Sequence, residues 1–323
     1  MKIIYVVANT VKCGGHKIIF EHLQGLTNRG HDCELCFVDN KHKWFEGSNF
    51  KLNNFNNLDN LINYLTKNKD AIKVATVWTT APHVAKSGGG YYLIFSIPTP
   101  HYLAESAKRD VLNTYKLGLH HIVQNVSAYT ILKYIWEVKV TRTEILAVDH
   151  NVFKPLKIDK KPGTGLYCYR NAPMKNPEMM ESTMSIIKDF KLYSYGQERC
   201  PFASDTFTNI SDSGVADIMN QSEVFISTST HEGFCLPLLE AMACGTPVIT
   251  TRSIGNEVFC VDEVNCLIVE NSGELKMAIN RILTDRNLSK RLSANGIMTA
   301  NNYQWDKIIN RLEGIYSETI FKS

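Results

Sequence analysis

Long hydrophobic runs are absent from this sequence of 323 residues. A transmembrane helix needs about 18 or more consecutive apolar residues, and no segment reaches that length. Residues 1–8 also lack the small-residue cleavage site of a secretory signal, and they have the β-forming character of a first strand. We therefore expect a cytoplasmic protein that does not span a membrane.

A disulfide framework is also missing. The nine cysteines are odd in number and stand singly inside strand-like and helix-like segments, which favours reduced thiols. Cys33 and Cys36 form the one Cys-x-x-Cys pair, but residues three apart in a strand face opposite sides of a sheet. Because no second pair follows at zinc-site spacing, buried thiols are the favoured interpretation and no metal site is expected.

A strong excess of one sign of charge is also absent, since the formal net charge is only +3. Residues 1–150 hold 17 Lys and Arg against 12 Asp and Glu, and the basic-aromatic segment 41–45 lies among them. An ordinary solvated surface explains this bias best, and an anionic acceptor or a peripheral contact with a membrane surface stays open. The electrostatic field of this small positive excess is too weak to predict nucleic-acid binding.

What is present is the composition and periodicity of a two-domain α/β protein. Hydrophobic residues make up 44% of the chain and charged residues 21%, as in soluble globular proteins. Short apolar runs alternate with helix-like segments throughout, which predicts parallel, doubly wound sheets. In the first half we expect strands over 3–8, 33–38, 72–78, 91–97 and 144–148, with a loop over 49–60.

The polar, Pro- and Gly-bearing segment 157–163 predicts a linker, after which a strand over 165–169 opens the second half. The last segment, 303–321, carries Trp305, Ile309 and Leu312 at helical spacing. It predicts a terminal helix.

The most informative stretch runs from Glu223 to Thr251 and predicts a strand, a loop, a helix and a second strand. Pro237 suits the first turn of the helix and Gly245 its end. Such a loop lies at the carboxyl edge of a parallel sheet, where open α/β sheets bind ligands. Glu232 falls on the loop and Glu240 one turn inside the helix. The alternative is two solvated glutamates on an ordinary loop and helix.

The free backbone N–H groups at the start of this helix favour an anion such as a nucleoside diphosphate. The residues that carry these groups are Gly233, Phe234, Cys235 and Leu236.

Glu232 and Glu240, with seven residues between them, resemble the signature of the retaining GT-B glycosyltransferases of family 4, also called glycosyl transferases group 1. The motif starts with Glu-Gly-Phe at Glu232 and ends with Glu-Ala-Met-Ala-Cys-Gly-Thr-Pro-Val from Glu240. The resemblance implies that Glu240 holds the donor ribose, that Glu232 lies beside the donor sugar, and that the loop amides hold phosphate and sugar. Cys235 departs from the family, which often has Gly at this position.

The resemblance extends to other segments. Gly14 and Gly15 resemble the glycine turn that passes close to the donor phosphate, although turn geometry alone is an equal explanation. Arg170 and Lys175 match the cations that the family uses to neutralise the diphosphate, and Tyr169 stands where the family usually has Gly. His101 is implied as the histidine that contacts the donor sugar.

His16 and His83 remain alternatives to His101 for this contact.

The implied architecture is two Rossmann-like domains with a C-terminal helix that crosses back to the first. Their boundaries are 1–153 for the acceptor side, 154–302 for the nucleotide-sugar side and 303–323 for the helix. No Asp-x-Asp occurs, which agrees with a metal-independent enzyme that needs no cofactor besides its nucleotide-sugar donor.

We therefore expect retaining transfer of a sugar to a hydroxyl of a glycan, a lipid or a protein-linked sugar, at the cytoplasmic membrane face if the acceptor is lipid-linked. The layout of 94–125 is similar to rhamnosyltransferase-like members. The alternatives are an epimerase or phosphorylase with the same fold, and a non-catalytic sugar-nucleotide binder.

Overall fold

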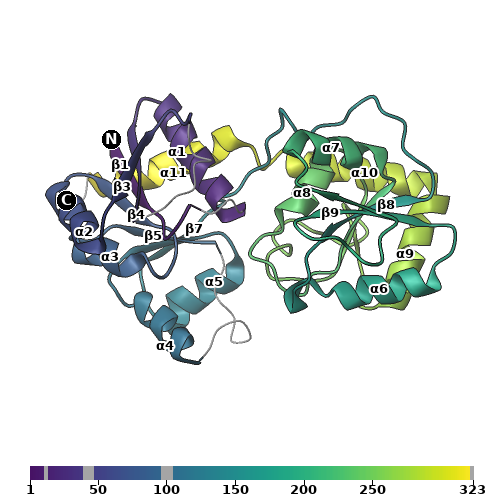
Figure 1. Cartoon of the computed structure of the whole chain (residues 1–323), viewed down its shortest axis with the longest axis horizontal. Helices are drawn as coiled ribbons and strands as arrows, with labels where there is room; N and C mark the ends of the chain where they lie inside the picture. Colours follow the sequence, from purple (N-terminus) through teal and green to yellow (C-terminus); the bar gives the residue numbers. More distant parts are fainter. Residues whose placement is uncertain (11–13, 39–46, 96–104, 321–323) are drawn as a thin grey trace. The chain divides into compact units, whose positions relative to one another are not determined.

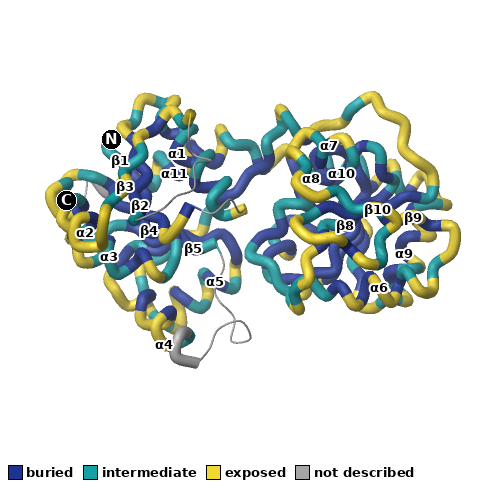
Figure 2. Tube along the Cα trace, in the orientation of Figure 1, coloured by how far each residue is buried: buried dark blue, intermediate teal, exposed yellow. Residues whose placement is uncertain are grey.

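The computed structural model describes residues 1–10, 14–38, 47–95 and 105–320. The chain forms two compact units (Figure 1). The first comprises Met1–Leu146 together with Trp305–Ser323, and the second comprises Ala147–Gln304. Each unit is a parallel sheet with helices on both faces, and Figure 2 shows that the buried residues concentrate on the strands and on the inner sides of the helices.

The first sheet has seven strands in the order β3-β2-β1-β4-β5-β6-β7, and every pairing is parallel. Its strands are β1 (Lys2–Val6), β2 (Asp32–Val38), β3 (Lys51–Phe55), β4 (Ile72–Ala75), β5 (Tyr91–Ile94), β6 (His120–Val123) and β7 (Val140–Arg142). The helices of this unit are α1 (Gly14–Asn28), α2 (Leu58–Lys67), α3 (Ala81–Lys86), α4 (Glu105–Thr114), α5 (Val126–Thr130), the π-helical turn η1 (Ile131–Ile135) and α11 (Trp305–Ile320).

Alternation along β1 assigns these helices to the two faces of the sheet. Ile4 and Val6 pack in one hydrophobic cluster with residues of α2, α3 and α4. Tyr5 points to the other face, where its hydroxyl contacts the hydroxyl of Tyr316 in α11 at 2.7 Å and Nδ1 of His22 in α1 at 3.3 Å. This division follows from the two-residue period of a strand.

Helix α11 is anchored to the first unit by polar contacts at several points. Arg29 and His31 both bind the carboxylate of Glu313, at 3.0 and 2.9 Å. The hydroxyl of Tyr91 donates to the carbonyl of Ile315 at 2.9 Å. These contacts confirm the predicted helix that returns from the end of the chain to the first domain.

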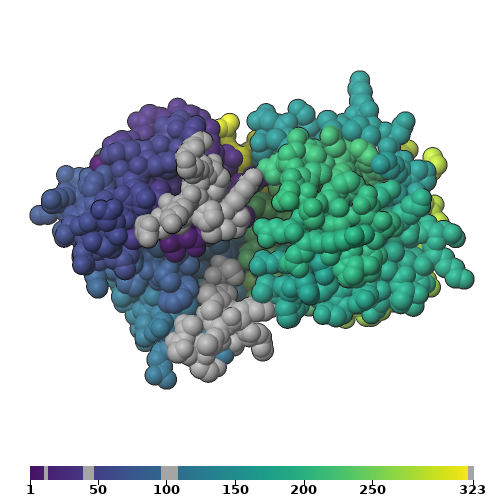
Figure 3. All heavy atoms as spheres, viewed as in Figure 1, coloured from purple at the N-terminus to yellow at the C-terminus, as the bar shows by residue number. Residues whose placement is uncertain are grey.

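The second sheet has six parallel strands in the order β10-β9-β8-β11-β12-β13. The strands are β8 (Thr164–Tyr169), β9 (Lys191–Gly196), β10 (Asp205–Thr208), β11 (Val224–Ser227), β12 (Val248–Thr250) and β13 (Leu267–Ile268). The helices are the 3-10 turn η2 (Pro173–Lys175), α6 (Pro177–Ile186), α7 (Asp212–Gln221), α8 (Leu236–Ala243), α9 (Ser272–Thr284) and α10 (Arg286–Ala300). Helices α7, α8 and α10 lie on one face, and α6 and α9 lie on the other (Figure 1). Figure 3 shows one surface of this unit in teal and green.

Two details of the sequence-based assignment are wrong. The apolar run 144–148 does not form a strand of the sheet, because the strand of this region, β7, ends before it at Arg142. The run instead makes isolated contacts, such as the hydrogen bond between the carbonyl of Ile145 and Nε2 of His22 at 2.7 Å. The Asn-rich segment 49–60 contains β3 and the start of α2 rather than a loop. As an edge strand, β3 carries polar residues, which conceals it from a hydrophobicity pattern.

Within the described part of the chain, no helix combines the length and the apolar character that crossing a membrane requires.

Candidate functional site

The candidate site lies in the second unit, at the carboxyl ends of the neighbouring strands β8 and β11. The loop 170–176 follows β8, and the loop 228–235 follows β11. Because parallel strands end at the same edge, the two loops meet. Tyr167 on β8 begins the connection, since its hydroxyl lies 2.9 Å from the hydroxyl of Thr228.

Hydrogen bonds fix one loop against the other. The hydroxyl of Thr228 lies 2.8 Å from the carbonyl oxygen of Lys175 and 2.9 Å from that of Asn176. The backbone N–H of Thr230 donates to the carbonyl of Met174 at 2.9 Å. These bonds join residues more than fifty positions apart in sequence, and they hold the backbones that carry Lys175 and Glu232 in register.

The ammonium group of Lys175 and the carboxylate of Glu232 form an ion pair across these loops. Their side chains are mostly buried, with exposed fractions of 21% and 15%. Burial disfavours the charged ammonium, but the adjacent Glu232 carboxylate outweighs that effect and raises the pKa of Lys175. The sequence predicted both residues for the site, and the structure brings them into contact.

Glu240 lies on the second turn of α8, as expected from the sequence, and is half-buried. Burial raises the pKa of the Cys168 thiol to about 11, and the charges of Lys175, Glu232 and Glu240 all act on this thiol. One cation and two carboxylates therefore lie close enough to Cys168 to influence its thiol.

Cys235 has a backbone conformation that explains why glycine is common at this position. Its φ of 65° and ψ of 62° are left-handed, and it is the residue immediately before α8. A residue with a Cβ is destabilised there by roughly 1–2 kcal/mol relative to glycine. Pro237 lies in the first helical turn, and Gly245 follows the helix with a φ of 72°.

The loop at Glu232 packs directly on a residue that we did not predict for the site, Gly255. A Cβ built at this glycine would lie 2.5 Å from the backbone nitrogen of Phe234 and 2.6 Å from the carbonyl oxygen of Glu232. The buried side chain of Asn256 holds the same turn by donating to the hydroxyl of Thr250 at 3.0 Å and accepting from Ser253 N–H at 3.0 Å. The close approach of two backbones shows why glycine is needed here.

The remaining predicted residues of the loop have different surroundings. Phe234 is buried, and its ring packs on Phe259 and Tyr303 at centroid distances of 5.2 and 5.6 Å, so it anchors the loop. Gly233 and Leu236 are half-buried. Arg170 is exposed at the start of the loop after β8.

The other predicted residues belong to the first unit. Gly14 and Gly15 are the first two residues of α1 rather than a turn before it, and a Cβ at either would meet no atom within 4 Å. His16 follows them in the same helix, and His83 lies in α3. His101 lies outside the described residues, as does the segment 41–45.

Part of the chain is similar to known protein families and structures. Residues 205–298 match the family model described as glycosyl transferases group 1. In sequence the chain is similar to an uncharacterized glycosyltransferase of Methanocaldococcus jannaschii, with 32% identity over 106 residues that cover 32% of this chain and 30% of the relative. It is also similar to the N,N'-diacetylbacillosaminyl-diphospho-undecaprenol alpha-1,3-N-acetylgalactosaminyltransferase of Campylobacter jejuni, with 26% identity over 184 residues that cover 52% and 48%. The chain thus spans about a third to a half of the length of these relatives.

In structure the chain is similar to Anabaena HepE in complex with UDP-glucose, with a TM-score of 0.82, 14% identity and coverage of 98% of this chain and 100% of that one. This likeness confirms the predicted GT-B fold. The chain therefore has the GT-B fold, and its residues 205–298 match the group 1 glycosyltransferase family. They support the resemblance at the level of this family and not at the level of a rhamnosyltransferase-like subgroup.

Proposed function

We propose that the protein is a retaining glycosyltransferase that moves a sugar from a nucleoside-diphosphate sugar to a hydroxyl acceptor. The observation that carries this proposal is the contact between Lys175 and Glu232 beside the start of α8. It joins a cation and a carboxylate beside a helix N-terminus at one sheet edge, and Glu232 and the start of α8 lie inside the segment 205–298 that matches the group 1 family. A diphosphate and a sugar need this combination.

Each residue then has a role in donor binding. Glu240 accepts hydrogen bonds from the ribose hydroxyls, and Arg170 and Lys175 neutralise the diphosphate. Gly14 and Gly15 allow close approach of the donor phosphate, and the N–H groups of the loop residues bind phosphate and sugar. These loop residues are Gly233, Phe234, Cys235 and Leu236. The donor of the HepE complex favours a uridine nucleotide for this chain too.

Donor binding requires a change at the ion pair. In the described chain, Lys175 is engaged with Glu232, so a diphosphate must compete for the ammonium group. When phosphate takes Lys175, the carboxylate of Glu232 is released toward the sugar. The lysine then stabilises the charge of about −1 that develops on the leaving diphosphate.

The retaining step proceeds by front-face displacement, in which the leaving phosphate accepts the proton of the acceptor hydroxyl. The bond from the anomeric carbon to the phosphate oxygen breaks as the bond to the acceptor oxygen forms on the same face. Glu232 as a covalent nucleophile is the second route. We assign to His101 a hydrogen bond to the donor sugar, with His16 and His83 as the alternatives to be tested by alanine substitution.

The acceptor in this proposal is a glycan or a lipid-linked sugar, and the protein works at the cytoplasmic membrane face. The substrate named for the Campylobacter jejuni relative, a diphospho-undecaprenol, supports a lipid-linked acceptor. In the first unit, Tyr134 and Ile135 are 66% and 69% exposed, and the ammonium group of Lys133 lies 5.7 Å from the Tyr134 ring. Aromatic, aliphatic and basic side chains together suit an anionic bilayer surface.

Cosedimentation with vesicles that contain phosphatidylglycerol tests the membrane contact. The variant Tyr134→Ser/Ile135→Ser should lose binding, and Met277→Ser, which changes a side chain 60% exposed in the second unit, should keep it. Equal binding by both variants would contradict a contact at this surface.

A panel of nucleotide sugars in a thermal-shift assay tests the proposed function itself. A ligand at 100 times its dissociation constant should stabilise the folded state by about 2.7 kcal/mol. Release of the free nucleotide together with a glycosylated acceptor indicates transfer, whereas conversion of the donor sugar into its epimer without an acceptor indicates an epimerase. Binding without any turnover indicates the third candidate, a sugar-nucleotide-binding protein.

A further inference from the structure

Three aromatic rings pack together beside the loop that carries Glu232. The ring centroids lie 5.2 Å apart for Phe234 and Phe259, 5.6 Å for Phe234 and Tyr303, and 5.9 Å for Phe259 and Tyr303. The interplanar angles of 52°, 60° and 69° are far from a parallel sandwich, as aromatic pairs prefer. All three side chains are buried, so Phe234 is enclosed by the other two rings.

Phe234 lies two residues after Glu232, in the loop 228–235 that contains neither helix nor strand. The position of this loop therefore depends on side-chain packing and on single hydrogen bonds, such as that from the N–H of Thr230 to the carbonyl of Met174. A ring held two residues away restricts the backbone from which the Glu232 carboxylate projects. The aromatic cluster thus limits where this carboxylate can lie.

The ring of Phe259 has a firm backbone behind it. Its N–H donates to the carbonyl of Asn256 at 3.1 Å, and its carbonyl accepts from the side-chain amide of Asn265 at 2.7 Å. Both asparagines are buried. Phe259 is therefore a fixed surface against which Phe234 and Tyr303 pack.

Tyr303 lies between α10 and α11 and is the last residue but one of the second unit. Its N–H donates to the carbonyl of Ala300 at 2.9 Å, and its carbonyl accepts from the N–H of Val148 at 3.0 Å. Val148 is the second residue of this unit, on the other connection to the first unit. The ring of Tyr303 therefore packs on Phe234 from a backbone that is hydrogen-bonded on both sides.

We propose that Tyr303 is a positioning residue for sugar transfer, which holds Glu232 beside the donor sugar through the ring of Phe234. This role rests on the proposed function, in which Glu232 acts at the donor sugar. Tyr303 is buried and acts through Phe234 rather than by contact with the donor. Because a misplacement of about 1 Å can lower a rate by about a hundredfold, the loss of this ring affects the chemical step.

The variant Tyr303→Leu removes the ring and keeps an apolar side chain. Its kcat with the selected donor should fall by about tenfold or more, because Glu232 is no longer held in one position. UDP lacks the sugar beside Glu232, so its affinity in calorimetry should change by less than about threefold. Unchanged kcat in Tyr303→Leu would overturn the proposal.

Two further variants separate positioning from a general loss of stability. Tyr303→Phe keeps the ring and should retain at least about half of the wild-type kcat. Phe55→Leu removes a half-buried ring that lies 5.2 Å from Tyr64 in the first unit, and it should lower the melting temperature without lowering kcat. An equal loss of kcat in Tyr303→Phe and Tyr303→Leu, or in Phe55→Leu and Tyr303→Leu, would also overturn the proposal.

Hydrogen exchange followed by mass spectrometry tests the contact without any substrate. In Tyr303→Leu, peptides that cover the loop 228–235 should exchange faster by about tenfold or more, whereas peptides of α9 should not change. Phe259→Leu, which removes the opposite ring, should have the same effect and replaces Tyr303→Leu if that variant does not fold. Unchanged exchange of the loop in the folded variant would contradict the role of the cluster.

The two measurements distinguish this proposal from the proposed function. Sugar transfer by the wild type together with normal kcat in Tyr303→Leu refutes the positioning role alone. Absence of transfer by the wild type with every nucleotide sugar, together with faster exchange in Tyr303→Leu, refutes the glycosyltransferase assignment, and Tyr303 then remains an anchor of the loop.

Discussion

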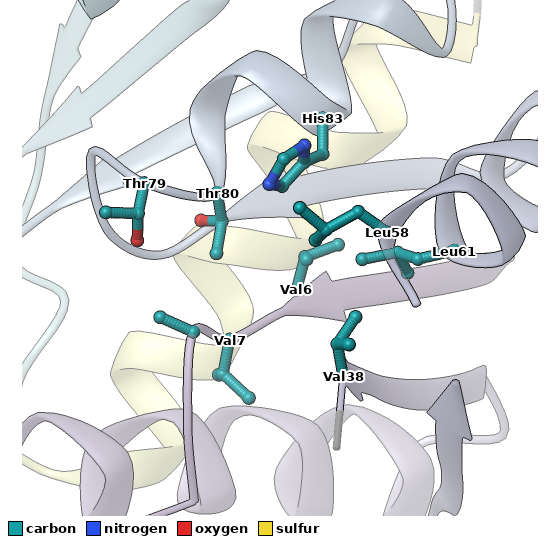
Figure 4. Close-up of a pocket in the computed structure, with 9 residues that line it drawn as sticks. Val6, Val7, Val38, Leu58, Leu61, Thr79, Thr80 and His83 are labelled. Atoms are coloured by element: carbon teal, nitrogen blue, oxygen red, sulfur yellow. The ribbon is translucent and has the colours of Figure 1, made fainter. Parts of the chain in front are cut away.

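The carboxyl edges of the two sheets are built alike but have different chemistry. In the second unit, the edge is formed by loops that hydrogen-bond to each other and hold Lys175 against Glu232. In the first unit, the edge borders a cavity lined mainly by aliphatic side chains, Val6, Val38 and Leu61 among them (Figure 4). The shared topology fixes where a ligand binds, and the side chains at each edge decide whether that ligand is charged.

The close packing of the loops at the carboxyl edge of the second sheet depends on Gly255. Substitution of Gly255 should therefore have the largest effect. In Gly255→Ala the new Cβ would lie within 2.7 Å of three backbone atoms of residues 232–234, which cannot move without displacing Glu232. We expect nucleotide binding to fall at least a hundredfold and the melting temperature to fall by several degrees.

Gly314→Ala is the matched control, because a Cβ there meets no atom within 4 Å and an exposed helical glycine gains stability on conversion to alanine. Calorimetric titration and thermal unfolding of both variants provide the measurement. Normal nucleotide affinity in Gly255→Ala would contradict the structural role of this turn.

Removal of the cation should have the next largest effect. Lys175→Ala removes a charge that stabilises the leaving diphosphate and leaves Glu232 unpaired. Turnover with the selected donor should fall by roughly 10²–10³, the scale found when one group that stabilises developing charge is removed. Lys188→Ala, at an exposed lysine after α6, should retain normal turnover, and a similar loss in both variants would exclude a specific role for Lys175.

The first unit has its own rigid polar cluster, away from the carboxyl edge. His22 is fully buried between Tyr5 and the carbonyl of Ile145, and burial lowers its pKa from 6.5 to about 4 despite the hydrogen bond to that carbonyl. The unfolded chain therefore binds a proton that the folded chain excludes. Stability is complete above pH 6.5 and is lost as the pH falls toward 4, by about 2 kcal/mol between pH 7.5 and 5.

Urea unfolding at both pH values measures this loss. His22→Gln retains an N–H donor for Ile145 but cannot titrate, so its decrease in stability over the same interval should be smaller by about 2 kcal/mol. Equal decreases in the two proteins would show that other groups cause the pH dependence.

Removal of metal ions is expected to have no effect on turnover, which makes it the smallest of the predicted effects. The proposed phosphate clamp consists of protein cations and amides, so EDTA should leave turnover unchanged. Loss of turnover on chelation, with recovery on addition of manganese or magnesium, would show that a metal ion completes the site.

Much of this arrangement could be predicted from the sequence, because apolar runs and helix-ending residues carry the necessary signals. The run Val224–Ser227, the Pro at 237 and the Gly at 245 indicated β11 and α8, and the spacing of the two glutamates indicated the site. Edge strands such as β3 and β10 remained hidden because most of their residues are polar, three of five in β3 and three of four in β10.

The residues that the sequence did not reveal act through three-dimensional proximity. Gly255 matters because two backbones touch, and the cavity lined by Val6, Val38 and Leu61 exists because β1, β2, α2 and α3 meet there. Neither contact leaves a periodic signal in the chain.

The central claim is that the edge carrying Glu232 and Glu240 binds a nucleoside diphosphate through Glu240, and calorimetry of two variants tests it most directly. Glu240→Ala should weaken binding of the nucleotide by about 1.5–3 kcal/mol, or roughly 10- to 150-fold, because the ribose hydroxyls lose a charged acceptor. Glu232→Ala should lose turnover without weakening nucleotide binding, because the diphosphate no longer competes with Glu232 for Lys175. Unchanged nucleotide affinity in Glu240→Ala would contradict the account.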